Sequence, residues 1–329
     1  MNSGKVVTVT LSPSLDRTLI THHLNLGYHN RVSDTTHLDA SGRGVNVSRA
    51  LSRLETPTHA IVLLGDDASG HAYRGLLSEE GFPVTVIKQP GPTRSDTIIV
   101  DRGSGEETHI IDEGSGGAPE DISRVLDRLK EVVTPGDMVV LAGLLPRDAS
   151  PDAYLLLAQA AHDAGAHVIS MTSGEILNQV LKAQPELIVL TRMEAESLFN
   201  YPVRTDADMI SGSHRLRELG AGKGMLVSDD YDSIVLSADS GTWLSEISET
   251  GPGTDSGVVD ALLAGYLAGL LQGMHVDDAF QQGAAAMNYA DSQIGNVFGT
   301  PDEIRQYSHR VSVRSMETHG RPSVTSEAS

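Results

Sequence analysis

The residues that could perform chemistry are concentrated in two glycine-containing segments far apart in the sequence. The first, residues 39–50, reads DASGRGVNVSRA and places two glycines and Arg43 at the start of a predicted helix. Backbone N–H groups at a helix N-terminus can bind an anion, and glycine allows the anion a close approach. A tight turn into an ordinary helix has the same pattern. This segment alone therefore does not distinguish an anion-binding turn from a structural one.

The second segment, residues 257–269, reads GVVDALLAGYLAG and predicts a helix with Asp260 in its first turn. A carboxylate beside a helix N-terminus, with small residues along one face, suits a catalytic base. An acid in the first turn also complements the helix dipole in many helices that have no catalytic role. Taken alone, Asp260 is therefore a weak signal.

Several other chemistries have no support in the sequence. The stretch 220–224, GAGKG, lacks the spacing of a P-loop and has glycine where the Mg²⁺-binding hydroxyl would stand. The thirteen histidines form no HExxH pattern, and no GxSxG nucleophile elbow is present. The absence of cysteine excludes disulfides and thiolate zinc sites.

The two segments must be positioned by alternating strands and helices. Helices are predicted from Ser150–Pro151 to Gly165, with Ser150 as N-cap, and from Asp206 to Leu219 before Gly220. Strands alternating with such helices indicate parallel βαβ units and a three-layer, doubly wound α/β sheet. The expected strands are Val6–Leu11, His59–Leu64, Asp137–Leu141, His167–Met171, Glu186–Leu190 and Met225–Ser228.

Two stretches interrupt this alternation. Residues 16–39 and 93–113 have partly alternating strand patterns, the second with a turn at Gly103–Glu107. We expect them to pair into a small β-sheet lid that covers the site or a partner subunit. Residues 1–307 should form one domain, and the polar, aperiodic residues 308–329 a disordered tail.

Composition and charge limit the partners. A formal net charge of -20 argues against a nucleic-acid or anionic-membrane surface. The stretch 258–271 has about half the ~20 apolar residues of a membrane span and contains an acid, so it predicts a packed helix. The first residues lack the apolar length of a signal peptide. We expect a cytoplasmic protein that binds a small molecule, with no nucleic-acid or membrane partner.

The order of the motifs resembles the PfkB/ribokinase-like carbohydrate kinases, in particular the 1-phosphofructokinase and tagatose-6-phosphate kinase branch. Leu11–Thr18, Ser41–Ala50, Thr93–Arg94 and the Asp260 helix occur in the family order across nearly 250 residues. Residues 143–146, 172–174 and 192–198 fall where the family has GSLP, DTSG and NRxEAExL. The resemblance covers residues 5–300 and implies a ribokinase-like three-layer α/β/α sandwich with a small β-sheet lid.

The resemblance also implies the reaction, transfer of the γ-phosphoryl group of ATP to a sugar-phosphate hydroxyl with Mg²⁺. Asp260 would take the proton of the attacking hydroxyl, and the N–H groups of Gly257, Val258 and Val259 would form the anion hole. The residues implied to bind sugar are Asp16, Gly42, Arg43 and Asn46, with Arg94 on the phosphate that the substrate already carries.

On the nucleotide side, the resemblance implies roles for Thr191, Glu194 and Ser228, with Glu194 organising Mg²⁺ through water. A homodimer through the lid is a further expectation. Several positions depart from the family pattern. Val259 stands in place of a glycine, where a β-branched residue resists unusual φ angles and crowds a phosphate. The other departures that matter here are Arg43 for Lys, Asp96 and Thr191 for Asn, and Asp229–Asp230 beside Ser228.

Two functions therefore remain open. One is an ATP-dependent sugar-phosphate kinase with full or reduced activity, which the retained Asp260 favours. The other is a catalytically degenerate relative that binds a sugar phosphate or a nucleotide as a sensor or regulatory subunit. Val259, Thr191 and Asp229–Asp230 favour the second function, because they change the nucleotide side and leave the sugar side largely intact.

Overall fold

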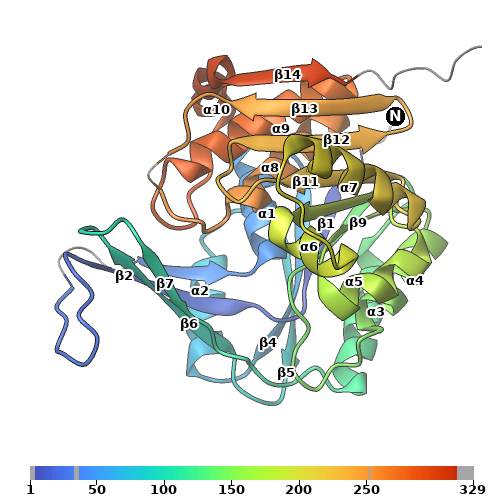
Figure 1. Cartoon of the computed structure of the whole chain (residues 1–329). Helices are drawn as coiled ribbons and strands as arrows, with labels where there is room; N and C mark the ends of the chain where they lie inside the picture. Colours follow the sequence, from blue (N-terminus) through green and yellow to red (C-terminus); the bar gives the residue numbers. More distant parts are fainter. Residues whose placement is uncertain (1–3, 33–36, 252, 317–329) are drawn as a thin grey trace, which may run out of the picture.

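A ten-stranded sheet forms the centre of the protein, in a computed structural model that describes residues 4–32, 37–251 and 253–316 (Figure 1). From one edge to the other the strands are β14 (Val311–Ser315), β13 (Gly241–Ile247), β12 (Ser233–Ala238), β11 (Lys223–Val227), β10 (Leu187–Thr191), β9 (His167–Met171), β8 (Met138–Ala142), β1 (Val6–Thr10), β4 (Thr58–Gly65) and β5 (Val84–Gln89). Neighbours from β5 to β11 are parallel, and β12, β13 and β14 add an antiparallel edge. The predicted doubly wound sheet is confirmed.

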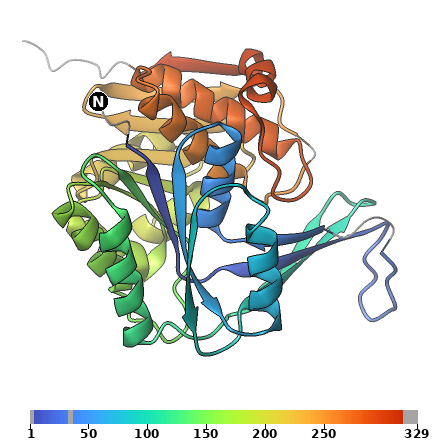
Figure 2. The ribbon, with the colours of Figure 1, turned by 180° about the vertical axis from the view of Figure 1, so that it is seen from behind.

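Helices cover both faces of this sheet, which explains the near-continuous apolar strands. All five residues of β1 are buried. Val6 packs in one core with α1, α8 and α9, whereas Val7 packs in another with α3 and α4 (Figures 1 and 2). The helices are α1 (Arg43–Arg53), α2 (Ala68–Leu77), α3 (Pro119–Val132), α4 (Ala153–Asp163), α5 (Gly174–Val180), α6 (Arg192–Phe199), α7 (Asp206–Glu218), α8 (Val258–Leu271), α9 (Val276–Asp291) and α10 (Pro301–Tyr307).

The apolar stretch that begins at Val258 is the central helix α8. Twelve of its fourteen residues are buried, because it packs against α1, α9 and the sheet core. This confirms the prediction of a packed helix. In the described parts of the chain, no helix has both the length and the apolar character needed to cross a membrane.

The two irregular stretches pair into one separate sheet, as predicted. Its strands lie in the order β3 (His37–Ser41), β2 (Ser14–Thr21), β6 (Arg94–Asp101) and β7 (Glu107–Ile110). β2 and β6 run parallel although about 80 residues separate them, which places Asp16 beside Asp96. This sheet, the lid, projects from the side of the main body (Figure 1). Residues 33–36 of the predicted lid lie outside the described residues.

Two predictions are wrong, namely that Ser150 is the N-cap of α4 and that the whole segment after residue 307 is disordered. Helix α4 begins at Ala153 with Asp152 as N-cap, because residues 150–153 form a turn closed by the N–H of Ala153 on the carbonyl of Ser150. The polar segment after residue 307 forms a short 3₁₀ turn and then β14, which pairs with β13. An edge strand needs few apolar side chains, and here the buried Val311 anchors it. Residues 317–329 lie outside the described residues.

Candidate active site

The two glycine-containing segments meet at the N-termini of α1 and α8. The Nδ2 atom of Asn46 donates a hydrogen bond of 2.9 Å to Oδ2 of Asp260, although 214 residues separate the two in sequence. Both side chains are buried. The structure therefore joins the two weak sequence signals into a single site, with Asp260 held in place by an amide donor.

Burial controls the acidity of Asp260. Desolvation raises the pKa of its carboxyl from the ordinary value of 3.8 to about 6, against the opposing effects of Arg43 and of the hydrogen bond from Asn46. A base with a pKa near 6 is ionised at neutral pH and accepts protons better than an ordinary carboxylate. The environment of Asp260 suits general base catalysis.

The turn before α8 leaves backbone donors available. Gly257 is the N-cap residue, with φ 77°, and no side chain caps this helix end. The first intrahelical bond is donated by the N–H of Ala261 to the carbonyl of Gly257, so the N–H groups of residues 257–260 have no partner within the helix. Together with the helix dipole, these donors can bind a negatively charged oxygen.

Glycine is required at position 257 for space as well as for its φ angle. A Cβ atom there would lie 2.8 Å from the ring of Phe298 and 3.0 Å from Oδ1 of Asn296. Val259, by contrast, has a regular helical backbone and packs in the apolar core with 7% of its surface exposed. The unusual φ angle expected at position 259 is absent, because only Gly257 in this turn takes a positive φ.

Gly42 and Gly44 allow α1 to begin close to the end of β1. Gly42 has φ 129°, and a Cβ atom on it would lie 2.8 Å from Cγ2 of Thr10. A Cβ atom on Gly44 would lie 2.5 Å from Oγ1 of the same threonine. The glycines predicted to approach an anion are thus also needed to seat the helix on the sheet.

The lid supplies the other side of the site. Desolvation raises the pKa of Asp16 to about 6, while hydroxyls of Ser14 and Ser41 act in the opposite direction. Among the residues that the structure describes, Oδ1 of Asp16 and Nε of Arg94 are buried and lack a hydrogen-bond partner. Buried polar atoms are rarely left unpaired, so these two atoms are candidates for contact with a ligand.

Arg94 is already engaged by a neighbouring acid. Its Nη2 atom lies 2.8 Å from Oδ2 of Asp96, and the two side chains are only 10% and 6% exposed. The other carboxylate oxygen of Asp96 accepts a 2.9 Å hydrogen bond from the N–H of Asp112. The guanidinium predicted to bind a phosphate therefore shares its charge with a buried carboxylate.

On the opposite side, Thr191 and Glu194 form a capping box at the start of α6. The N–H of Thr191 donates to Oε2 of Glu194 at 2.9 Å, and the N–H of Glu194 donates to Oγ1 of Thr191 at 3.3 Å. The other oxygen of Glu194 lies 3.5 Å from Nη2 of Arg43. Arg43 thus connects the predicted Mg²⁺-organising acid with the surroundings of Asp260.

The acids near Ser228 are partly neutralised. Nε of Arg192 donates to Oδ2 of Asp229 at 2.9 Å, and Asp230 also contributes to the raised pKa of this arginine. The hydroxyl of Ser228 donates to Oδ1 of Asp232 at 2.8 Å. Arg192 thus offsets part of the negative charge of Asp229–Asp230.

Sequence reasoning missed Asn296, which lies in the loop between α9 and α10. Its Nδ2 atom donates to the hydroxyl of Ser41 at 3.5 Å, at the end of β3, and its buried Oδ1 faces Gly257. Asn296 therefore links the lid to the turn before α8. No motif surrounds it in the sequence, and only its position after a helix of small residues gives any signal.

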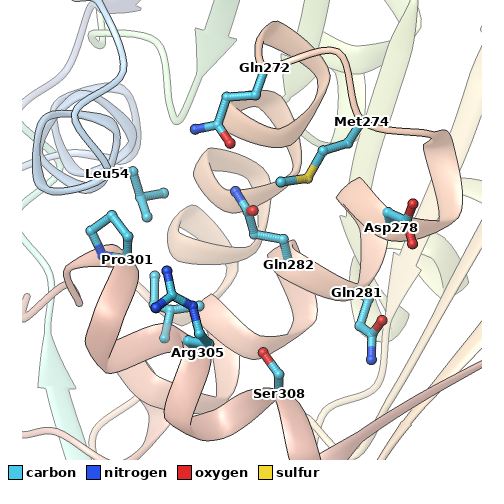
Figure 3. Close-up of a pocket in the computed structure, with 10 residues that line it drawn as sticks. Leu54, Gln272, Met274, Asp278, Gln281, Gln282, Pro301, Arg305 and Ser308 are labelled. Atoms are coloured by element: carbon cyan, nitrogen blue, oxygen red, sulfur yellow. The ribbon is translucent and has the colours of Figure 1, made fainter.

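A separate hollow of about 360 Å³ lies at the other ends of α1 and α8, beyond Leu54 and Gln272 (Figure 3). Figure 3 shows its rim of amides and charged groups, among them Gln282 and Arg305. Because Arg43 and Asp260 stand at the opposite ends of these helices, this hollow is not part of the site.

In this site a cation would meet the carboxylate of Glu194, whose two oxygens lie against the N–H of Thr191 and against Arg43. No group of three or more His, Cys, Asp or Glu side chains suited to hold a metal ion occurs among the described residues. Mg²⁺ usually keeps several waters and is bound through one or two carboxylates together with substrate phosphates. Glu194 can supply such a carboxylate through water.

Comparisons with known proteins identify the family. The family described as "pfkB family carbohydrate kinase" matches residues 10–302. A 1-phosphofructokinase of Bacillus subtilis is 27% identical over 308 residues, 94% of this chain and 99% of that protein. A tagatose-6-phosphate kinase of Staphylococcus epidermidis is 29% identical over 242 residues, 71% of this chain and 72% of that protein.

Solved structures share the fold. Phosphofructokinase-2 from Escherichia coli in complex with substrates and products gives a TM-score of 0.85 at 21% identity, covering 93% of this chain and 98% of that one. The tetrameric inhibited form of the same enzyme gives a TM-score of 0.82 at 21% identity, with the same coverage. The predicted ribokinase-like α/β/α fold is confirmed.

Proposed function

The chain belongs to the pfkB family of carbohydrate kinases, and we propose that it phosphorylates a sugar phosphate with ATP, as 1-phosphofructokinases and tagatose-6-phosphate kinases do. One observation carries this proposal. Asp260 is buried, has a raised pKa and is oriented by Asn46 beside the uncapped N-terminus of α8. A base and an anion-binding turn stand together where a hydroxyl could attack a phosphoryl group.

Asp260 and the turn before α8 act on the two ends of the forming bond. The Asp260 carboxylate accepts the proton of the substrate hydroxyl while the hydroxyl oxygen forms a bond to the γ-phosphorus of ATP. The bond from that phosphorus to the bridging oxygen of ATP breaks, and ADP leaves. The N–H groups of residues 257–259 stabilise the negative charge on the transferring group. The products are a sugar bisphosphate, ADP and a proton first held by Asp260.

The lid side of the site holds the sugar phosphate. Oδ1 of Asp16 accepts a hydrogen bond from a sugar hydroxyl. The turn at Gly42, together with Asn46, positions the hydroxyl that reacts. Nε of Arg94 donates to the phosphate that the substrate already carries. The proposal is supported by the two buried, unpartnered atoms on Asp16 and Arg94, which a ligand of this chemistry would satisfy.

On the nucleotide side, we assign Thr191 and Ser228 to the border of the ATP site and Glu194 to a water shell of Mg²⁺. Bound with the phosphates of ATP, Mg²⁺ would neutralise part of their charge. Arg43, 3.5 Å from Glu194, adds a positive charge on the path between this acid and Asp260.

A second candidate is a degenerate relative that binds a phosphosugar or a nucleotide without turnover. One observation favours it, namely that both oxygens of Glu194 are engaged, one by the N–H of Thr191 and the other by Arg43. A carboxylate held in this way is less free to organise a cation. This candidate keeps the sugar side of the site and loses only the chemistry.

One experiment separates the two candidates. Turnover of ATP is measured with fructose 1-phosphate, fructose 6-phosphate and tagatose 6-phosphate, beside calorimetric titration of each sugar phosphate and of the nucleotide. A kinase yields ADP and a sugar bisphosphate with at least one of them. Binding without turnover supports the degenerate relative, and absence of both binding and turnover contradicts both candidates.

We also propose that two copies of the chain associate through the lid. Strand β7 and the loop after β2 expose large apolar side chains, with exposed fractions of 85% for Leu26, 80% for Tyr28 and 58% for Ile110. A related kinase with this fold has been solved as a tetramer. A second copy of the same lid would cover these residues.

A further inference from the structure

The pair formed by Arg94 and Asp96 changes the phosphate subsite of the lid. Residues 94 and 96 are two apart on β6, so their side chains leave the same side of the strand. Both are nearly buried, and the 2.8 Å contact joins Nη2 of Arg94 to Oδ2 of Asp96. A buried charge pair of this kind is hard to separate, because each partner would then be left without compensation.

The contact with Asp96 occupies one N–H donor group of the Arg94 guanidinium, Nη2. An arginine binds a phosphate most strongly when two of its N–H groups face two oxygens. Nη2 faces Asp96, whereas the buried Nε has no partner. Because Nε is buried, a phosphate that approaches Arg94 must share the rest of the guanidinium with the carboxylate of Asp96.

Displacement is opposed from both sides of Asp96. Its Oδ1 atom is held by the N–H of Asp112, which ties the carboxylate to the segment that follows the lid. Asp16 is its register neighbour on β2, and Asp39 is the register neighbour of Asp16 on β3. A doubly charged phosphate entering this row of carboxylates is repelled, and Arg94, the cation that acts on Asp16, is shared with Asp96.

We propose that Asp96 is a specificity-determining residue that competes with the phosphate of the substrate for Arg94. It lowers the affinity for phosphorylated sugars and narrows the preference for them over the neutral sugars of the same shape. This inference rests on the proposed function, because it takes Arg94 as the phosphate ligand. The carboxylate of Asp96 would thus set the relative affinity for phosphorylated and neutral sugars.

The test is the isosteric change Asp96→Asn. The amide oxygen can still accept from the N–H of Asp112, so the local structure is retained, while the charge that holds Nη2 is removed. We expect the Kd of fructose 1-phosphate or tagatose 6-phosphate, whichever the wild type binds, to fall by roughly tenfold or more. The Kd of the neutral sugar and that of ATP should stay within about twofold. The affinity for the phosphorylated sugar relative to that for the neutral sugar therefore rises.

The matched control is Glu106→Gln, which removes one negative charge from an exposed turn of the same lid. It should change none of these constants, since exposed charges at a distance are screened by salt. If thermal melting shows that the asparagine variant is not folded, Asp96→Ser carries the same expectation.

The outcomes distinguish this inference from the proposed function. If the wild type phosphorylates a sugar phosphate and Asp96→Asn leaves its Kd unchanged or raises it, the inference is wrong and the proposed function stands. If neither protein binds any phosphosugar, the proposed function fails and the inference fails with it. A fall in Kd confined to Asp96→Asn, with Glu106→Gln unchanged, supports both.

Discussion

The carboxyl of Asp260 determines how the reaction should respond to pH. Its pKa is raised to about 6 by burial, and only the ionised form accepts a proton. We expect kcat/KM to be level above about pH 7 and to fall by about tenfold per pH unit well below 6. A pH–rate profile with the preferred sugar phosphate measures this limb. A profile that stays level down to pH 4.5 would show that a group with an ordinary carboxyl pKa, or no base, controls the reaction.

The same residue should cost stability at neutral pH. Because the pKa of Asp260 is higher in the folded protein than in the unfolded chain, folding favours the protonated form, and the ionised form is penalised as the pH rises through 6. Asp260→Asn is always neutral and can still accept from Asn46. We expect it to raise the free energy of unfolding at pH 7.5 by about 2–3 kcal/mol, with the gain vanishing near pH 4. Urea denaturation at both pH values tests this, and an equal effect at both would refute the electrostatic explanation.

Residue types and motif order indicated which residues belong to the candidate site, but the pairings of these residues could not be predicted. Asp260, Asn46 and Arg94 follow from motif order, and the structure places Asp260 against Asn46. The pairing of Arg192 with Asp229 joins a helix start to a loop 37 residues away, and nothing in the local pattern indicates it. An unusual φ angle at position 259 was expected because the family pattern has glycine there, whereas the φ angle depends on where α8 begins.

At the scale of elements, the turn that starts α8 depends on Gly257. An alanine there would incur about 1–2 kcal/mol for its positive φ, and overpacking against Phe298 and Asn296 would add about 1–3 kcal/mol. We expect Gly257→Ala to lower both the free energy of unfolding and kcat. Chemical denaturation and steady-state turnover provide the two measurements.

Gly273, just after the other end of α8, offers a matched control. Its φ is 79°, close to that of Gly257, and a Cβ atom on it would meet nothing within 4 Å. Gly273→Ala should therefore show only the cost of the backbone conformation and leave kcat unchanged. Equal losses of stability and activity in the two variants would mean that the space around Gly257 has no special role.

The elements themselves were largely predictable, because periodicity and end signals are local. The parallel strands and the separate lid follow from runs of apolar or alternating residues. The parallel register that sets Asp16 beside Asp96 depends on segments about 80 residues apart, so the shared face of the two acids is visible only in the structure. Strand β14 was missed since its pairing with β13, not its composition, makes it a strand.

At the scale of the whole molecule, the exposed apolar side chains of the lid, Leu26, Tyr28 and Ile110, predict a dimer. Ile110→Asp places a charge on a residue that is 58% exposed, and it should shift the sedimenting mass from twice 34.9 kDa to 34.9 kDa. Leu156→Asp, on a 44% exposed residue of α4, is the control that should leave the mass unchanged. A wild type that sediments as a monomer at micromolar concentration would contradict association through the lid.

The central claim is that Asp260 at the start of α8 drives phosphoryl transfer from ATP to a sugar phosphate. The most direct measurement follows label from [γ-³²P]ATP into a sugar bisphosphate, for the wild type and for Asp260→Asn, with each of the three candidate sugar phosphates. We expect label in the bisphosphate of at least one sugar with the wild type, and a rate lowered by about 10²–10⁴ in the variant. No labelled bisphosphate from the wild type, or equal labelling by both proteins, would contradict it.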